Sequence, residues 1–207
     1  MLEPKIVLVG YSGHGVVVAE SAKASLMNLC YYTEKESLKL NIFDLEYIGF
    51  EGDSDFKYWD ENLNFILGIG DNSIRKKVAQ LILSHHKAIL NVIDPTANIS
   101  NHINLGKGNF IAKHAVVNTL ASIGDYCIIN TGAIIEHDCK ISSGVHVAPG
   151  ACLLGNVSVG ENSFIGANSV VKENTVIGKN VVVGASAVVL NDIEDNTKVV
   201  GNPARVI

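Results

Sequence analysis

Residues 127–147 read CIINTGAIIEHDCKISSGVHV, with an aliphatic residue at every sixth position: Ile129, Ile135, Ile141 and Val147. The residue two places before each of these is mostly small, and glycine often follows the aliphatic residue elsewhere in this half of the chain. A six-residue period fits neither a strand, which repeats every two residues, nor a helix, which repeats every 3.6. The same spacing continues without a slip through Ile93, Ile99, Leu105, Ile111, Val117, Ile123, Leu153, Val159, Ile165, Val171, Ile177, Val183 and Val189.

A fixed six-residue period is typical of a parallel β-helix built from hexapeptide repeats. Each repeat forms one flat face of a triangular prism, so three repeats complete one coil. The aliphatic side chains point inward and stack on the equivalent residue of the next coil, about 4.8 Å away. Their burial alone does not offset the entropy lost in ordering so many residues, so we expect the prisms to associate as a homotrimer.

The first ninety residues have a different pattern, typical of alternating strands and helices. We expect strands at 5–9, 46–50 and 64–69, a helix at 15–24, and a helix at 73–86 whose apolar positions are 74, 78, 81 and 82. The segment 28–44 fits neither element and is interpreted as an insertion or a helix extension. The predicted fold is therefore an α/β N-terminal domain (1–90), a small parallel sheet of Rossmann-like βαβαβ order, followed by a left-handed parallel β-helix (91–207).

Composition excludes several functional classes. Nearly half of the 207 residues are hydrophobic (47%), 18% are charged, and the net charge is −5. A nucleic-acid surface is not expected without a basic cluster, and no apolar run is long enough to span a membrane. The apolar run near the N-terminus is broken by glycine and is interpreted as a buried strand rather than a signal peptide. The four cysteines form no CxxC pair, which favours small buried side chains in a reducing cytoplasm.

Several motifs together make the sequence resemble the PglD/NeuD type of bacterial sugar acetyltransferase. They are the segment 130–138 (NTGAIIEHD), VHV at 145–147, GN at 155–156, the loop GYSGHG at 10–15, GDNSIR at 70–75 and the ending GNPA at 201–204. The resemblance covers nearly the whole chain apart from 28–44. It implies a cytoplasmic enzyme that transfers acetyl from acetyl-CoA, without a metal, to a nucleotide-linked sugar.

His137 is the candidate general base. It follows the inward Ile135 by two residues, so it should lie at a prism corner and point outward, where an imidazole can take a proton from an attacking amine or hydroxyl. Asp138 can fix its tautomer; the resembling family usually has Glu here. Gly155 and Asn156 lie one coil further on, directly above this pair, and a backbone N–H there could bind the oxyanion.

The resemblance implies further contacts in the second half of the chain. Asn130 would lie near the acceptor and His146 near the thioester end of CoA, although His146 could equally be an ordinary surface histidine. The body of CoA would run along a groove between two prisms toward the C-terminal coils. Its expected contacts are Gly166, Gly184, Gly201, Asn202, Pro203 and Ala204.

The loop between the first strand and the first helix carries Gly10, Ser12, Gly13, His14 and Gly15. Glycines allow backbone amides to approach a phosphate, and a helix N-terminus favours an anion, although such a loop can also be only a tight turn. The resemblance implies that this loop binds the nucleotide of a nucleotide-sugar, with an acidic residue after the second strand on the base or ribose. The candidates for that acid are Glu51 and Asp53.

The leading hypothesis is N-acetylation of a nucleotide-linked amino-deoxy sugar by direct attack on acetyl-CoA. O-acetylation of a sialic-acid-like sugar is the alternative, and His137 does not discriminate the two. A zinc hydratase on the same prism would need three converging histidines, which the spacing of the histidines does not provide. A non-catalytic scaffold would tolerate loss of His137, and a nicotinamide dehydrogenase would need a different glycine fingerprint.

Overall fold

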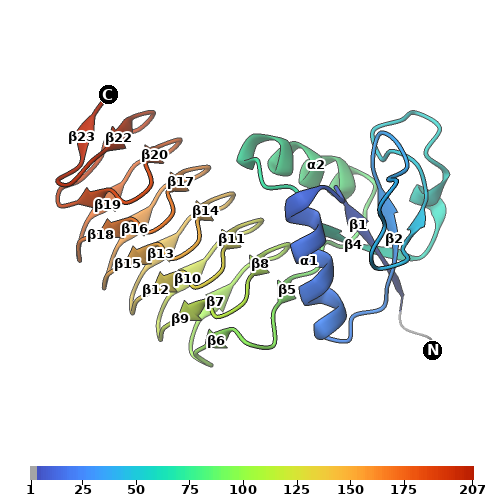
Figure 1. Ribbon diagram of the computed structural model, residues 1–207, viewed down its shortest axis with the longest axis horizontal. Coiled ribbons are helices and arrows are strands. Elements are labelled where there is room, and N and C mark those ends of the chain that lie inside the picture. The colour runs from blue at the N-terminus through green and yellow to red at the C-terminus, as the bar shows by residue number, and fades with distance from the viewer. Residues whose placement is uncertain (1–3) are drawn as a thin grey trace.

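The computed structural model describes residues 4–207 and has the two-part architecture predicted from the sequence (Figure 1). A four-stranded parallel sheet with helices forms the α/β half, and a left-handed parallel β-helix follows it. In Figure 1 the first coils of the prism lie beside the α/β half and the last coils lie at the far end. In the part of the chain that the structure describes, every helix is too short or too polar to cross a membrane.

The sheet has the order β3-β2-β1-β4, with β1 (Lys5–Val9) at its centre. Its other strands are β2 (Leu29–Thr33), β3 (Glu46–Tyr47) and β4 (Leu63–Leu67). Alternate residues of β1 pack in two clusters, one with α1 (Gly13–Ala24) and the other with α2 (Asn72–Ser84), so both faces of the sheet are covered. A short 3-10 helix, η1 (Lys57–Asp60), precedes β4.

The interpretation of residues 28–44 was wrong. Leu29–Thr33 forms β2, which pairs with β1 on one side and β3 on the other. The sequence LCYYT is rich in aromatic and β-branched residues, as strands are, but it does not alternate because it is covered on both sides. The remainder, from Glu34 to Asp44, has turns and no regular element.

The buried face of α2 is rotated about the helix axis relative to the face predicted from the apolar positions. The buried residues are Arg75, Ala79 and Ile82. Ile74, expected to be buried, is 51% exposed and borders the cleft described below. A buried arginine on the core side of the helix misleads any prediction based on hydrophobicity alone.

The prism has three sheets, one for each face. The first face contains β5 (Val92–Ile93), β8 (Phe110–Ile111), β11 (Ile128–Ile129), β14 (His146–Val147), β17 (Phe164–Ile165), β20 (Val182–Val183), β22 (Lys198–Val200) and β23 (Arg205–Val206). The second face contains β6 (Asn98–Ile99), β9 (Val116–Val117), β12 (Ile134–Ile135), β15 (Cys152–Leu153), β18 (Val170–Val171) and β21 (Val188–Val189). The third face contains β7 (Asn104–Leu105), β10 (Ser122–Ile123), β13 (Lys140–Ile141), β16 (Ser158–Val159) and β19 (Val176–Ile177).

The six-residue row forms the core of the prism as predicted, with a departure at each end. From Ile111 to Val189 every member is at most 3% exposed, whereas Ile93 is 36% exposed because no coil lies beneath it. Strands pair with the residue 18 positions later, as in Ile135 with Leu153. At the C-terminal end the last coil is shorter, and Ile177 pairs with Ile193.

The α/β half packs against the first face of the prism. Val92, Phe110 and Ile128 point out of that face and join the apolar cluster that contains α1. The Ser21 hydroxyl of α1 donates to Asp94, and Lys113 pairs with Glu20. Within one chain the α/β half thus partly covers the first face.

Candidate active site

A cleft of about 430 Å³ opens at the carboxyl edge of the sheet. Each strand supplies part of its lining: Gly10 and Ser12 follow β1, Glu34 follows β2, Phe50 and Glu51 follow β3, and residues 68–71 follow β4. Ligands of open parallel sheets bind at this edge.

The glycines of the loop after β1 have different roles. Gly10 has a φ of 81°, in the left-handed region. A Cβ on Gly15 would collide with the carbonyl oxygen of Gly10, so Gly15 is required by packing. A Cβ on Gly13 would meet nothing within 4 Å, so its small size has no reason within the chain and leaves open space at the start of α1.

The two helices that begin at this edge have unlike N-termini. Asp71 caps α2, and its Oδ1 accepts hydrogen bonds from the Ile74 amide at 2.9 Å and the Ser73 hydroxyl at 2.7 Å. The Ser12 side chain makes no capping bond to α1, and the first turn of α1 has no acidic residue. The amides of Gly13 and His14 have no acceptor within residues 4–207. At α2 the Asp71 carboxylate already occupies the helix end, whereas the positive end of α1 and its free amides remain open to an anion.

The acids predicted after the second strand, Glu51 and Asp53, follow β3, which is the third strand in the chain. The strand second in the chain is β2, and Glu34 directly follows it and lines the cleft. One oxygen of Glu34 accepts a hydrogen bond from the Tyr11 amide at 2.8 Å. Glu51 also lines the cleft, but Asp53 lines a separate depression with Phe56 and Tyr58.

Three predicted residues meet where the α/β half touches the prism. The side-chain amide of Asn130 lies 3.1 Å from His146 Nε2, and the His146 and His14 ring centroids are 6.2 Å apart. His146 is buried, which excludes the surface-histidine alternative. Burial, with a smaller contribution from the Arg75 charge, lowers the pKa of both histidines to about 4. His14 Nε2 and His146 Nδ1 are buried without a partner in the described residues, so this junction is polar and incomplete.

Arg75 fastens this junction and was not predicted as a functional residue. Its Nε donates to the carbonyl of Tyr126 and one terminal nitrogen to Gly144, both in the prism. The other terminal nitrogen donates to the carbonyls of Ile69 and Gly70 in the loop after β4. It is 1% exposed, and burial lowers its pKa to about 10. The guanidinium therefore holds the cleft loop against the prism.

His137 lies at the corner between the second and third faces and points outward, with 60% of its side chain exposed. Its Nδ1 is 2.8 Å from Asp138 Oδ2, so the shorter acid reaches the ring. A Cβ on Gly155 would lie 2.6 Å from His137 Cε1 and 2.7 Å from Nε2. The missing side chain at 155 thus makes room for the imidazole itself.

The backbone at Gly155 leaves one donor free. The Asn156 amide donates to the carbonyl of His137, and the Asn156 side chain bonds Asn174 on the next coil. The Gly155 amide has no acceptor within the part of the chain that the structure describes. The corner therefore offers an imidazole nitrogen beside an unpaired backbone N–H.

The predicted CoA contacts lie on a different corner. Gly166, Gly184 and the segment 201–204 lie on the corner between the first and second faces, which also contains Asn130. We call this the Asn130 corner and the one above the His137 corner. The second face separates them, so one chain does not bring the two sets together. A Cβ on Gly166 would meet the backbone of the next coil at 2.5 Å, so coil packing already requires this glycine.

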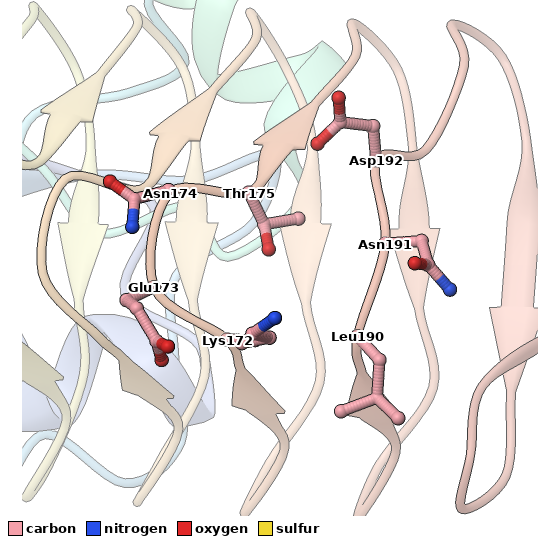
Figure 2. A pocket seen from close by; sticks show the side chains of 7 residues that line it. All are labelled: Lys172, Glu173, Asn174, Thr175, Leu190, Asn191 and Asp192. Carbon is pink, nitrogen blue, oxygen red and sulfur yellow. The ribbon is translucent and has the colours of Figure 1, made fainter.

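A groove continues the His137 corner toward the C-terminus (Figure 2). It forms where the shortened last coil leaves the corner above Asn174 incomplete. Figure 2 shows Lys172 and Thr175 on one coil facing Leu190 and Asp192 on the next. The Val176 amide donates to Asp192 Oδ1 at 2.8 Å, which closes the shorter turn.

Comparison with known proteins gives two family matches along this chain. Residues 5–82 match the PglD N-terminal domain, and residues 156–191 match the bacterial transferase hexapeptide repeats. The structure of perosamine N-acetyltransferase from Caulobacter crescentus is 30% identical, with a TM-score of 0.93 over 100% of this chain and 98% of that one. The chain belongs to the PglD-type sugar acetyltransferases.

Two further structures agree with this assignment. The acetyltransferase domain of PglB from Neisseria gonorrhoeae is 29% identical, with a TM-score of 0.91 over 99% of this chain and 100% of that one. WeeI from Acinetobacter baumannii has a TM-score of 0.87 at 23% identity over 98% and 99% of the two chains, and it supports the fold alone. The resemblance inferred from sequence motifs is confirmed, and the protein is an acyltransferase.

In this sugar acetyltransferase the predicted site residues fall into separate groups. Gly10, Ser12 and Glu51 line the cleft. His14, Asn130 and His146 lie at the junction between the α/β half and the prism. His137, Asp138, Gly155 and Asn156 lie at the His137 corner. Sequence reasoning missed Glu34 and Arg75. Correct placement of β2 would have found Glu34, and the GDNSIR motif already contained Arg75.

Proposed function

We propose that this protein transfers an acetyl group from acetyl-CoA to the amino group of a nucleotide-linked amino-deoxy sugar, with His137 as general base. The observation that carries the proposal is the His137 corner, where an exposed imidazole bonded to Asp138 stands beside the free amide of Gly155. Two relatives support the choice of reactants. The Caulobacter crescentus enzyme is described in complex with CoA and GDP-perosamine, and the Neisseria gonorrhoeae domain in complex with acetyl coenzyme A.

The proposed chemistry follows from the two nitrogens of His137. With its Nδ1–H donating a hydrogen bond to Asp138, the neutral ring keeps a lone pair on Nε2, which removes a proton from the sugar amine as the amine attacks the thioester carbonyl. The carbonyl oxygen becomes an oxyanion, which the Gly155 amide can bind. Collapse expels the CoA thiolate, which takes up the proton held by His137. A carbon–nitrogen bond forms and the carbon–sulfur bond breaks without an acyl-enzyme.

The nucleotide part of the substrate is proposed to lie in the cleft of residues 1–90. The free amides and positive end of α1 suit a pyrophosphate, and Gly13 leaves room for it. From there the sugar would extend past Gly70 toward His14, His146 and Asn130. In this scheme residues 1–90 form the nucleotide-sugar domain and residues 91–207 the acetyl-CoA domain.

A homotrimer is proposed because the site is divided between two corners of one prism. The outward residues of the second face form a half-buried apolar row: Val116, Ile134, Cys152, Val170 and Val188. The equivalent row of the third face is more polar, with Ser122, Lys140 and Ser158. Three prisms that turn their second faces toward a common axis would bring the His137 corner of each beside the Asn130 corner of its neighbour.

Acetyl-CoA is proposed to lie between these two corners, with its thioester at Gly155. The groove around Lys172 on one copy and the corner of Gly166 and Gly184 on the next would then flank it. No metal ion takes part in this scheme.

The test is release of free thiol from acetyl-CoA against UDP-, dTDP- and GDP-linked 4-amino-4,6-dideoxy sugars and free sialic acids. Release with an amino sugar supports the proposal. Release with sialic acids alone would replace it by O-acetylation, and absence of release across the panel would reject the proposed acceptor.

A further inference from the structure

The far end of the cleft contains two buried polar side chains, Glu51 and Thr33. Glu51 is 5% exposed, and its carboxylate is approached by its own backbone N–H but pairs with no cation among the described residues. The hydroxyl of Thr33, itself fully buried, approaches that carboxylate without reaching hydrogen-bond geometry. A desolvated carboxylate and an unpaired hydroxyl at the wall of an open cleft are costly unless a ligand pairs with them.

The order of the strands assigns each part of a nucleotide to a place along the cleft. The proposed pyrophosphate site is the loop between β1 and α1, and β2 and β3 follow outward along the sheet in that order. The Glu34 amide donates to the carbonyl of Gly49, so Phe50 and Glu51 lie directly beside the end of β2. Glu34 would therefore face the ribose, and Glu51 would face the base.

The chemistry of Glu51 restricts the base. An ionised carboxylate only accepts hydrogen bonds and can take two parallel N–H donors. Guanine has two adjacent donors on its pairing edge, at N1 and at the exocyclic N2. Uracil and thymine have one donor flanked by two carbonyl oxygens, and adenine and cytosine have an acceptor beside their amino group. Only guanine satisfies both carboxylate oxygens without placing an acceptor against them.

We propose that this cleft selects guanine, with Glu51 accepting both N–H donors of the base and Phe50 providing a ring beside it. The inference rests on the proposed function, because guanosine diphosphate would be the nucleotide to which the sugar to be acetylated is linked. Burial raises the pKa of Glu51, and the two donors of guanine would stabilise its ionised form. Removing the negative charge should therefore weaken guanine binding without lowering the stability of the fold.

The first experiment is calorimetric titration of the full-length protein with GDP, UDP, ADP and CDP. We expect GDP to bind about 10–100-fold more tightly than the others. Tighter binding of another nucleotide, or affinities within threefold of one another, would overturn the assignment.

Two matched variants locate the effect. Glu51→Gln should remove most of the GDP preference and leave UDP binding within threefold. Asp53→Asn, on the same loop but outside the cleft, should leave all affinities unchanged. Equal weakening of GDP and UDP in Glu51→Gln would mean that Glu51 shapes the loop, and the proposal would be rejected. Thermal unfolding of Glu51→Gln at an unchanged or higher temperature serves as the folding control.

A transfer assay separates this proposal from the proposed function. One 4-amino sugar linked either to GDP or to UDP is offered with acetyl-CoA. Thiol release with the UDP-linked sugar alone overturns guanine selection but supports the proposed acetyl transfer. If GDP binds preferentially but neither sugar causes thiol release from acetyl-CoA, guanine selection is supported and the proposed acceptor is rejected.

Discussion

The cleft and the His137 corner differ in how complete they are within one chain. The cleft is built by the ends of all four strands of one sheet, and two of its polar residues, Glu51 and Thr33, are deeply buried. At the corner the His137 side chain is 60% exposed, and the Gly155 amide has no acceptor in the described chain. One chain therefore completes the proposed nucleotide site, whereas the proposed transfer site needs a neighbouring prism.

This difference makes binding and turnover separable. A change at the corner should stop acetyl transfer and leave nucleotide affinity intact, because the cleft and the corner share no residues. A change at the interface should act in the same way without touching either site. The predictions below use that separation.

Replacing His137 should have the largest effect. We expect His137→Ala to lower kcat by roughly 10²–10⁴-fold, the usual contribution of a general base, with nucleotide affinity unchanged by calorimetry. His102→Ala removes another exposed prism histidine and should retain full activity. A loss below threefold in His137→Ala would reject the assignment.

Disrupting the second face should separate binding from turnover without altering a site residue. Val170 and Ser158 are both half-buried and outward-facing, on the second and third faces respectively. Val170→Arg places a charge in the proposed apolar interface, so sedimentation should show dissociation of the trimer and turnover should fall by about 10²-fold. Ser158→Arg should change neither. Full activity of a monomeric Val170→Arg protein would contradict the divided site.

A methyl group at Gly155 should have a smaller effect. Gly155→Ala forces the His137 ring to move, since the new Cβ would lie 2.6 Å from Cε1, and we expect kcat to fall about 10-fold. The double variant with His137→Ala should lose no more activity than His137→Ala alone, because the ring is then absent. Additive losses would place the role of Gly155 elsewhere, for example with the thioester.

The prism could be predicted residue by residue because its repeat is self-consistent. The rule that placed Ile135 inward and Gly155 over His137 is a stacking distance of 18 residues, and one register error would have broken the whole row. The contact between His137 and Asp138 depends on rotamers, so it needed the structure. The shortened last coil, and with it the groove of Figure 2, follows no repeat that the sequence displays.

The α/β half was harder to predict because its elements are defined by burial on two sides. β2 lies between two strands and is covered by helices and loops, so the sequence LCYYT does not alternate. Because β2 was missed, Glu34, which directly follows it, was not among the candidate acids, and only Glu51 and Asp53 were considered. Arg75 is polar in sequence yet buried in the structure, and only the five acceptors that surround it explain why.

The junction between the two regions should make stability depend on pH. The folded-state pKa values of His14 and His146 are about 4, against an ordinary value of 6.5. The unfolded chain therefore binds more protons between about pH 6.5 and pH 4, so this contribution is fully present above pH 6.5 and declines as the pH falls through that window. The loss should be on the order of a few kcal/mol for the pair, measured as a lower urea midpoint at about pH 5 than at about pH 7.5. The His14→Asn, His146→Asn double variant should flatten that dependence, because its junction has no imidazole to protonate; a dependence as steep as in the unmodified protein would place the titrating groups outside the junction.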